Sequence, residues 1–173
     1  LLVVSAIVIT ISYKSLKKLP LSAYIKAISY SLPDSILKNE YLAAQYPEWS
    51  VDKIESKTGI KERRVAKNDE TAIDLAVQAI EHFFEEHDFA RSKIDFLILC
   101  TQSSDYFLPP SACILQDRVG LPINIGAFDI NLGCSGFIYG LGVAKGLVET
   151  GQAKNVMFVT SDTYRKYIHP KDK

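Results

Sequence analysis

Residues 126–137 read Gly-Ala-Phe-Asp-Ile-Asn-Leu-Gly-Cys-Ser-Gly-Phe, and this stretch predicts both a fold class and a reactive centre. An apolar strand is expected over residues 127–130, followed by a tight corner at residues 131–133. Cys134 comes next, and a glycine-spaced segment then predicts a helix to about residue 149. A strand, a sharp turn, a small nucleophilic residue and a helix have the outline of a nucleophile elbow. The N–H groups and partial positive charge of a helix start favour thiolate over thiol, so Cys134 is a candidate nucleophile.

The composition is that of an ordinary globular protein with one sizeable core. The chain has 173 residues, of which 47% are hydrophobic and 23% charged. Its 20 basic and 20 acidic residues give a net charge of zero, so no basic field favours nucleic-acid binding. The three cysteines at positions 100, 113 and 134 are an odd number without metal-like spacing. This pattern argues against a disulfide framework and favours a reducing cytoplasm.

The first 12 residues are apolar and are followed by Lys14, Lys17 and Lys18. A membrane-spanning helix needs roughly 20 apolar residues, so this run is too short by itself. We therefore interpret residues 1–20 as an apolar leader or the remnant of an anchor that lies outside the fold, and residues 21–173 as one domain. Membrane association through residues 1–18 is the less favoured alternative.

Strands that alternate with helices predict an α/β fold with a doubly wound, mostly parallel sheet and helices on both faces. The predicted strands cover residues 23–31, 94–101, 127–130 and 155–160. The predicted helices cover residues 39–45, 51–57, 68–88, 111–119 and 135–149. Thr71 and Asp74 match a capping box at the start of the clearest helix. The charged segment 59–65 is expected to be an exposed turn or a rim that meets an anionic substrate.

Several candidate sites have structural alternatives. Cys100, at the end of an apolar strand, and Cys113, inside a helix, are expected to be buried core residues. The loop at residues 102–110 follows a strand, which makes it a candidate active-site or partner-contact loop. His82 and Glu86 share a helix face, but no further ligand lies nearby, so we expect no metal site. Physical reasoning from the residues leaves Cys134 open between a nucleophile and a buried structural cysteine.

The glycines of the segment after Cys134 are unusually frequent. They stand at positions 136, 140, 142 and 146. Because a glycine inside a helix costs about 1 kcal/mol relative to alanine, their number predicts a helix pressed closely against its sheet or against another backbone. A dinucleotide-binding fingerprint is not formed, since its third glycine would have to stand at Lys145.

The segment Ala-Phe-Asp-Ile-Asn-Leu-Gly-Cys-Ser-Gly-Phe with its glycine-bearing helix resembles the active-site segment of beta-ketoacyl-acyl-carrier-protein synthase III, a thiolase-fold condensing enzyme. Three other stretches resemble this family in order and spacing. They are Lys-Thr-Gly-Ile-Lys-Glu-Arg-Arg at residues 57–64, Pro-Ser-Ala-Cys at 110–113 and Val-Thr-Ser-Asp at 159–162. The resemblance covers about residues 23–173 and implies the N-terminal half of a thiolase-like fold.

By this resemblance, Cys134 takes an acyl group from a thioester and the acyl-enzyme condenses with malonyl-acyl-carrier-protein in fatty acid or related lipid or secondary-metabolite biosynthesis. The implied partners are acyl-carrier protein, the acyl thioester and a second copy of the chain, with loop 102–110 near the partner's acyl pocket. No metal or resident cofactor is implied, because acyl-coenzyme A or acyl-carrier protein is the substrate. The His and Asn that the family uses for decarboxylation belong to the second half of the fold, so this chain by itself is expected to be inactive.

Three lysines stand where relatives use other residues to hold coenzyme A. Lys53 and Lys57 replace a Trp and an Arg, and Lys166 replaces another Arg. Lysine attracts phosphate as a point charge but cannot bind it bidentately. These lysines are the candidate substrate-binding residues, and they favour a carrier-bound or unusual acyl donor over acetyl-coenzyme A. Two alternatives remain: a truncated or degenerate non-catalytic homologue that binds a condensing enzyme or carrier protein, and a cysteine hydrolase.

Overall fold

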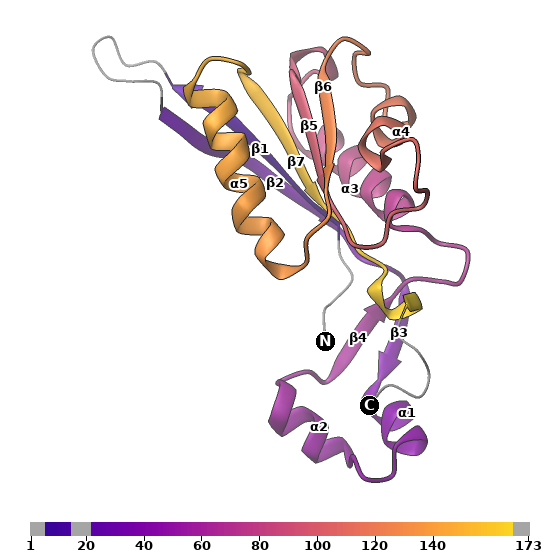
Figure 1. Cartoon of the computed structure of the whole chain (residues 1–173). Coiled ribbons are helices and arrows are strands. Elements are labelled where there is room, and N and C mark those ends of the chain that lie inside the picture. The colour runs from indigo at the N-terminus through magenta and orange to yellow at the C-terminus, as the bar shows by residue number, and fades with distance from the viewer. Residues whose placement is uncertain (1–5, 15–21, 168–173) are drawn as a thin grey trace.

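The computed structural model describes residues 6–14 and 22–167, and Figure 1 shows a twisted sheet with helices on both faces. The sheet has five strands in the order β2-β1-β7-β5-β6. Their bounds are Ser22–Ser31 for β2, Ala6–Lys14 for β1, Asn155–Thr160 for β7, Phe96–Cys100 for β5 and Gly126–Ile130 for β6. β5 is parallel to β7 and β6, whereas β1 is antiparallel to β7 and β2. All strands except β1 therefore run in one direction, which confirms the mostly parallel mixed sheet.

Strand β1 corrects the interpretation of residues 1–20 as a segment outside the fold. Residues 6–14 pair with β2 on one side and β7 on the other, so this part of the segment lies inside the sheet. Val8 packs in the core under one layer of helices, while Ile9 and Ile11 pack in the core under the other. A strand covered on both faces is apolar at nearly every position, and this is why it resembled an anchor. Residues 1–5 and 15–20 lie outside the described residues, and none of the described helices is long and apolar enough to cross a membrane.

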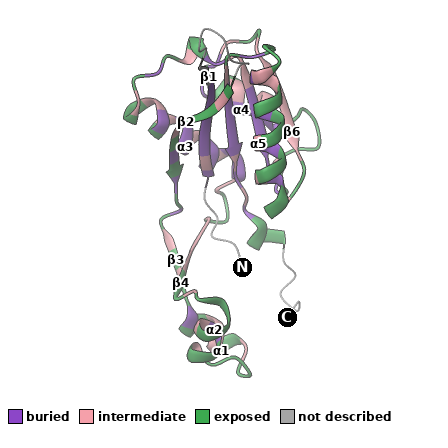
Figure 2. Ribbon diagram, turned by 90° about the vertical axis from the view of Figure 1, so that its left-hand side faces the viewer, coloured by how far each residue is buried: buried purple, intermediate pink, exposed green. Residues whose placement is uncertain are grey.

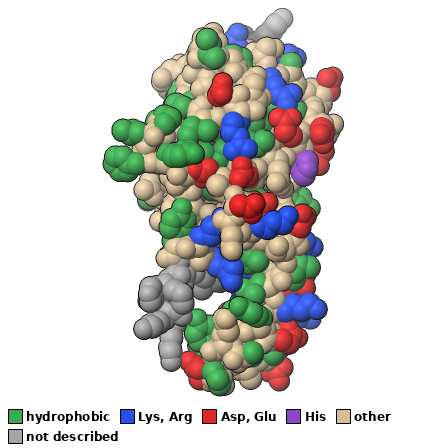
Figure 3. Space-filling view, turned by 90° about the vertical axis from the view of Figure 1, so that its right-hand side faces the viewer, with side chains coloured by type: hydrophobic (Ala, Val, Ile, Leu, Met, Phe, Trp, Pro, Cys, Tyr) green, Lys and Arg blue, Asp and Glu red, His purple; other side chains and the backbone are tan. Residues whose placement is uncertain are grey.

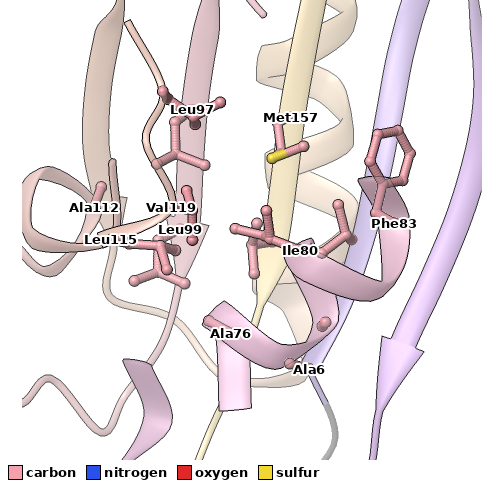
Figure 4. Close-up of a cluster of buried hydrophobic side chains, with 14 of the residues drawn as sticks. Ala6, Ala76, Ile80, Phe83, Leu97, Leu99, Ala112, Leu115, Val119 and Met157 are labelled. Carbon is pink, nitrogen blue, oxygen red and sulfur yellow. The ribbon is translucent and has the colours of Figure 1, made fainter. Parts of the chain in front are cut away.

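One face of the sheet is covered by α3 (Ala72–Glu86) and α4 (Ser111–Arg118). Figure 4 shows Ile80 and Phe83 of α3 turned toward Met157 of β7 in the buried cluster between helices and sheet. Fully burying a side chain of this size contributes about 1.5–3 kcal/mol. The predicted capping box is confirmed, because Asp74 N–H donates to Thr71 Oγ1 (3.2 Å) and Thr71 N–H donates to Asp74 Oδ2 (2.8 Å).

The other face of the sheet is covered by α5 (Cys134–Glu149), which lies along the strands (Figure 1). Ala144 and Val148 of this helix are buried with Ile98 of β5 and Phe158 of β7. Gly140 allows this close packing, since a Cβ at that position would lie 2.2 Å from the Phe158 ring. The predicted helix pressed on its sheet is therefore confirmed for Gly140, although nothing lies within 4 Å of a Cβ at Gly142 or Gly146.

A small module extends beyond one end of the sheet (Figure 2). It consists of β3 (Ser35–Lys38), α1 (Asn39–Gln45), α2 (Val51–Thr58) and β4 (Glu62–Val65), with β3 and β4 paired antiparallel. Its centre is the buried Asn39, which donates to Ile60 O (2.7 Å) and accepts from Arg63 Nη1 (2.7 Å). The prediction of an exposed turn over residues 59–65 was wrong for residues 62–65, which form the strand β4. Charged side chains are compatible with a strand here, because an antiparallel ribbon can turn one face to solvent.

Candidate functional site

Cys134 is the first residue of α5 and follows β6 across the corner formed by residues 131–133. Its side chain is exposed. The helix cap is Gly133, which has no side chain to bond the first turn. The strand, corner, cysteine and helix predicted from residues 126–137 are all present, so the outline of a nucleophile elbow is confirmed. The chemical role of the thiol stays a prediction.

Cys100 lies behind the first turn of α5, at the carboxyl end of β5. A Cβ at Gly136 would lie only 2.3 Å from Cys100 Sγ, so the glycine lets the helix start lie against this strand. The thiol of Cys100 is 4% exposed and donates to Leu132 O (3.2 Å). Burial raises the pKa of this thiol, and the nearby Asp162 carboxylate raises it further. Cys100 is thus the buried core cysteine that was predicted, whereas Cys113 is only half buried.

The loop at residues 102–110 begins next to the corner that carries Cys134. The Gln102 side chain lies beside Gly133, where an added Cβ would be 2.7 Å from Gln102 Oε1. Farther along the loop, Tyr106, Phe107 and Leu108 are exposed, and Phe107 is 98% exposed. The structure therefore brings the start of this predicted active-site loop to the corner before Cys134 and turns three large apolar side chains toward solvent.

Asp162 is a member of the site that the sequence did not single out. It follows β7, and its carboxylate accepts hydrogen bonds from Gln102 N–H (3.1 Å) and Ser103 Oγ (2.5 Å). Burial raises the pKa of Asp162, while the hydrogen bonds from Ser103, Gln102 and Thr101 oppose that rise. The sequence signal, Val-Thr-Ser-Asp at residues 159–162, was noted as a strand end and as a stretch that resembles the family, without a role for Asp162.

The three predicted substrate-binding lysines lie on two separate elements. Lys53 and Lys57 are one turn apart on α2, and Lys53 Nζ bonds Glu48 O (3.0 Å) and lies 4.6 Å from the centre of the Trp49 ring. Lys166 lies in the short 3-10 helix η2 (Tyr164–Tyr167) and donates to Asn68 O and Glu70 O before α3. Figures 1 and 2 both show α2 at the far end of the small module and η2 close to the sheet.

Neither the surface charge nor the arrangement of metal-ligating side chains points to a further ligand at this site. On the face shown in Figure 3, acidic and basic side chains are interspersed, in keeping with the net charge of zero. Within residues 6–14 and 22–167, no group of three or more His, Cys, Asp or Glu side chains could hold a metal ion.

Comparison with known proteins supplies the family. Residues 128–173 match the sequence model described as 3-oxoacyl-[acyl-carrier-protein (ACP)] synthase III. The Beta-ketoacyl-[acyl-carrier-protein] synthase III of Caldanaerobacter subterraneus is 40% identical over 145 residues, which are 82% of this chain and 42% of that protein. A crystal structure of a 3-oxoacyl-(acyl-carrier-protein) synthase III superposes with a TM-score of 0.79 at 46% identity, covering 98% of this chain and 45% of that one. The chain belongs to the 3-oxoacyl-[acyl-carrier-protein] synthase III family.

The synthase III relatives are more than twice as long as the segment matched here. A similar enzyme of Campylobacter jejuni is 41% identical over 146 residues, which are 82% of this chain but 44% of that protein. The chain thus spans less than half the length of the curated relatives that it matches. The part matched by the synthase III sequence model begins at Phe128 and includes Cys134.

Proposed function

We propose that Cys134 is the acyl-accepting nucleophile of a condensing enzyme. The observation that supports this most directly is the exposed thiol at the first residue of α5, within the segment that matches the synthase III family. In the first step the thiolate attacks the thioester carbonyl, and the thiolate of coenzyme A or of the carrier protein leaves. The backbone N–H of Cys134, at the helix start, is placed to stabilise the oxyanion that forms.

The second step joins the acyl group to malonyl-acyl-carrier-protein. Loss of carbon dioxide from the malonyl group leaves a carbanion, which attacks the acyl carbonyl and releases the Cys134 thiolate. The family uses a His and an Asn to stabilise the carbanion. His82 and His87 belong to α3 and its C-cap and make hydrogen bonds to β2, so neither is assigned this role. Both steps are therefore proposed for the complete enzyme, to which this chain contributes the Cys134 nucleophile.

The proposed partners are acyl-carrier protein and a second copy of the chain. β6 is the last strand of the sheet, and a free strand edge is able to pair with another chain. The exposed side chains of loop 102–110 offer apolar area for the same contact. Lys53 and Lys57 share one exposed helix and are proposed, with Lys166, to attract the phosphate groups of the donor. We place the protein in the cytoplasm, in keeping with three unpaired cysteines.

Labelling with an acyl thioester tests the proposed nucleophile. The protein is incubated with an isotope-labelled acyl-coenzyme A and an acyl-carrier-protein thioester, and the tryptic peptides are analysed by mass spectrometry. We expect an acyl adduct on Cys134 that is lost in Cys134→Ala and kept in Cys113→Ala, because Cys113 is half buried in α4. No adduct on Cys134 in the complete enzyme, or equal labelling of Cys134→Ala, contradicts the proposal.

The non-catalytic alternative is a homologue that binds a carrier protein or a condensing enzyme. The same experiment separates the two functions, since stable binding of acyl-carrier protein without an adduct on Cys134 supports the alternative.

A further inference from the structure

Two aspartates join the parallel strands β5 and β7 at opposite ends of the pair. Asp162, after β7, accepts from the N–H of Gln102, which follows β5 (3.1 and 3.3 Å to its two oxygens). Asp95, before β5, accepts from the N–H groups of Lys154 (2.7 Å) and Asn155 (2.9 Å) at the start of β7. We call these two sets of hydrogen bonds the Asp162 clamp and the Asp95 clamp. In both, an aspartate carboxylate accepts from backbone N–H groups of the neighbouring strand's end. Only the Asp162 clamp lies at the end of the sheet where β6 leads into Cys134.

The Asp162 clamp has a solvent-exposed part, the bonds to Gln102 N–H, and continues on its other side into buried polar groups. Ser103 Oγ donates to Asp162 Oδ1 (2.5 Å) and accepts from Thr163 N–H (3.0 Å). Ser103 is 1% exposed and Thr163 is 3% exposed. Hydrogen bonds in such a water-poor setting hold their partners firmly, because a broken bond leaves an unpaired polar group. The network therefore fixes the first residues of loop 102–110 against the segment that follows β7.

The path from this network to the nucleophile is short. The amide of the Gln102 side chain fills the space beside Gly133, where an added Cβ would be 2.7 Å from Oε1 and 3.4 Å from Cδ. Gly133 is the cap of α5 and directly precedes Cys134. The backbone of Gln102 is held by Asp162, and the side chain of Gln102 occupies the volume next to the start of the helix.

We propose that Asp162 is a positioning residue for Cys134 and acts through Gln102 and Gly133. Asp162 itself touches no reacting atom in this role. Its importance for acyl transfer rests on the proposed function of Cys134. The expected consequence is that loosening this clamp changes the reactivity of Cys134, whereas loosening the Asp95 clamp does not.

The test compares Asp162→Asn with Asp95→Asn as a matched control in the 173-residue chain. Both substitutions keep the shape of the side chain and remove one negative charge. The rate of Cys134 alkylation by iodoacetamide is followed from pH 6 to 10 by peptide mass spectrometry, and urea unfolding of each variant is measured in parallel. We expect Asp162→Asn to slow alkylation of Cys134 about tenfold at neutral pH, because the start of the helix that carries the thiol is held less firmly. Asp95→Asn should stay within about twofold of the original rate at comparable loss of stability.

Equal rates in all three proteins would overturn the inference, and so would equal slowing by both substitutions, which would mean a general loss of stability. Gln102→Ala tests the path itself and replaces Asp162→Asn if that variant does not fold. Its effect on the Cys134 rate should be similar and should not add to that of Asp162→Asn, because both act through one contact. Alkylation is independent of acyl transfer, so rapid alkylation of Cys134 together with no acyl labelling of the complete enzyme contradicts the proposed function and leaves this inference intact.

Discussion

Gly136 and Gly142 lie on the same helix but meet opposite surroundings. A Cβ at Gly136 would be 2.3 Å from Cys100 Sγ and 2.9 Å from Leu132 Cβ. No heavy atom would lie within 4 Å of a Cβ at Gly142. Packing therefore requires the glycine at 136, whereas among the described residues nothing requires the one at 142.

Alanine at these two positions should have effects of opposite sign. Gly136→Ala forces a methyl group against Cys100 and is expected to lower the free energy of unfolding by about 1–3 kcal/mol. Gly142→Ala removes a glycine from an exposed helix interior and is expected to raise it by about 0.5–1 kcal/mol. Urea unfolding of the 173-residue chain and both variants measures the difference. Destabilisation by both, or by neither, would show that the close contact at Gly136 does not limit stability.

Among single residues, the sequence predicted a role for Cys134 but not for Asp162. The reason is the distance along the chain between each residue and the residues that define its surroundings. The strand, corner, cysteine and helix around Cys134 are local in the chain, so their pattern is legible within residues 126–137. The partner of Asp162 at Gln102 is 60 positions away, and a clamp between the ends of two strands depends on how the strands are ordered in the sheet. Lys166 was singled out by family position alone, and its bonds to the segment before α3 had no local signal.

The start of α3 joins two helices through one carboxylate. Asp74 completes the capping box with Thr71 and forms an ion pair with Arg118 Nη2 of α4 (2.8 Å). Burial by itself would raise the pKa of Asp74, but the hydrogen bonds from Thr71 and Arg118 together outweigh burial and lower it. The carboxylate therefore stabilises the fold at any pH above its usual value of 3.8, and this contribution is lost as pH falls through the lower value of the folded state.

Asp74→Asn should accordingly destabilise the chain in a pH-dependent way. We expect a loss of about 1 kcal/mol at pH 7, the usual size of a cap contribution, and a smaller difference from the original chain at pH 3. Asp69→Asn is the matched control, because Asp69 is exposed just before the same helix and the substitution changes the net charge equally. Urea unfolding at both pH values measures the differences. A loss from Asp74→Asn that is equally large at pH 3 would contradict the role of the ionised carboxylate.

Element length and burial explain why α3 and α5 were predicted and why three strands were not. The helices α3 and α5 were predicted because they are long, with 15 and 16 residues that carry a periodic or glycine-spaced pattern. The strands β3 and β4 have four residues each, too few to show an alternation, and they were missed. The segment that contains β1 was interpreted as a leader or the remnant of an anchor outside the fold, since burial on both faces makes a central strand and a membrane segment look alike in sequence.

Among the described residues, the outer side of α5 and the adjoining face of β2 expose large apolar side chains. On the outer side of α5, Ile138 is 66% exposed and Tyr139 is 62% exposed, and Val143 is exposed as well. Figure 2 shows much of this helix as exposed. Ile28 of β2 is also exposed. It lies on the α5 side of the sheet, because it is directly opposite Ile9 of β1, which packs in the core under α5. Contiguous exposed apolar surface drives association, and in the relatives more than half of the protein lies outside the matched segment.

We therefore expect the 173-residue chain to associate in solution as its concentration rises, which light scattering after size-exclusion chromatography measures. Replacing Ile138 and Val143 together by Lys should increase the monomer fraction several-fold, because the charges interrupt the apolar surface of α5. Lysines at the exposed polar positions Ser92 and Gln152 add the same charge elsewhere and should have little effect. An equal increase in the monomer fraction with the control pair would identify net charge as the cause. A monodisperse chain that unfolds cooperatively as a monomer would show that the outer side of α5 needs no cover.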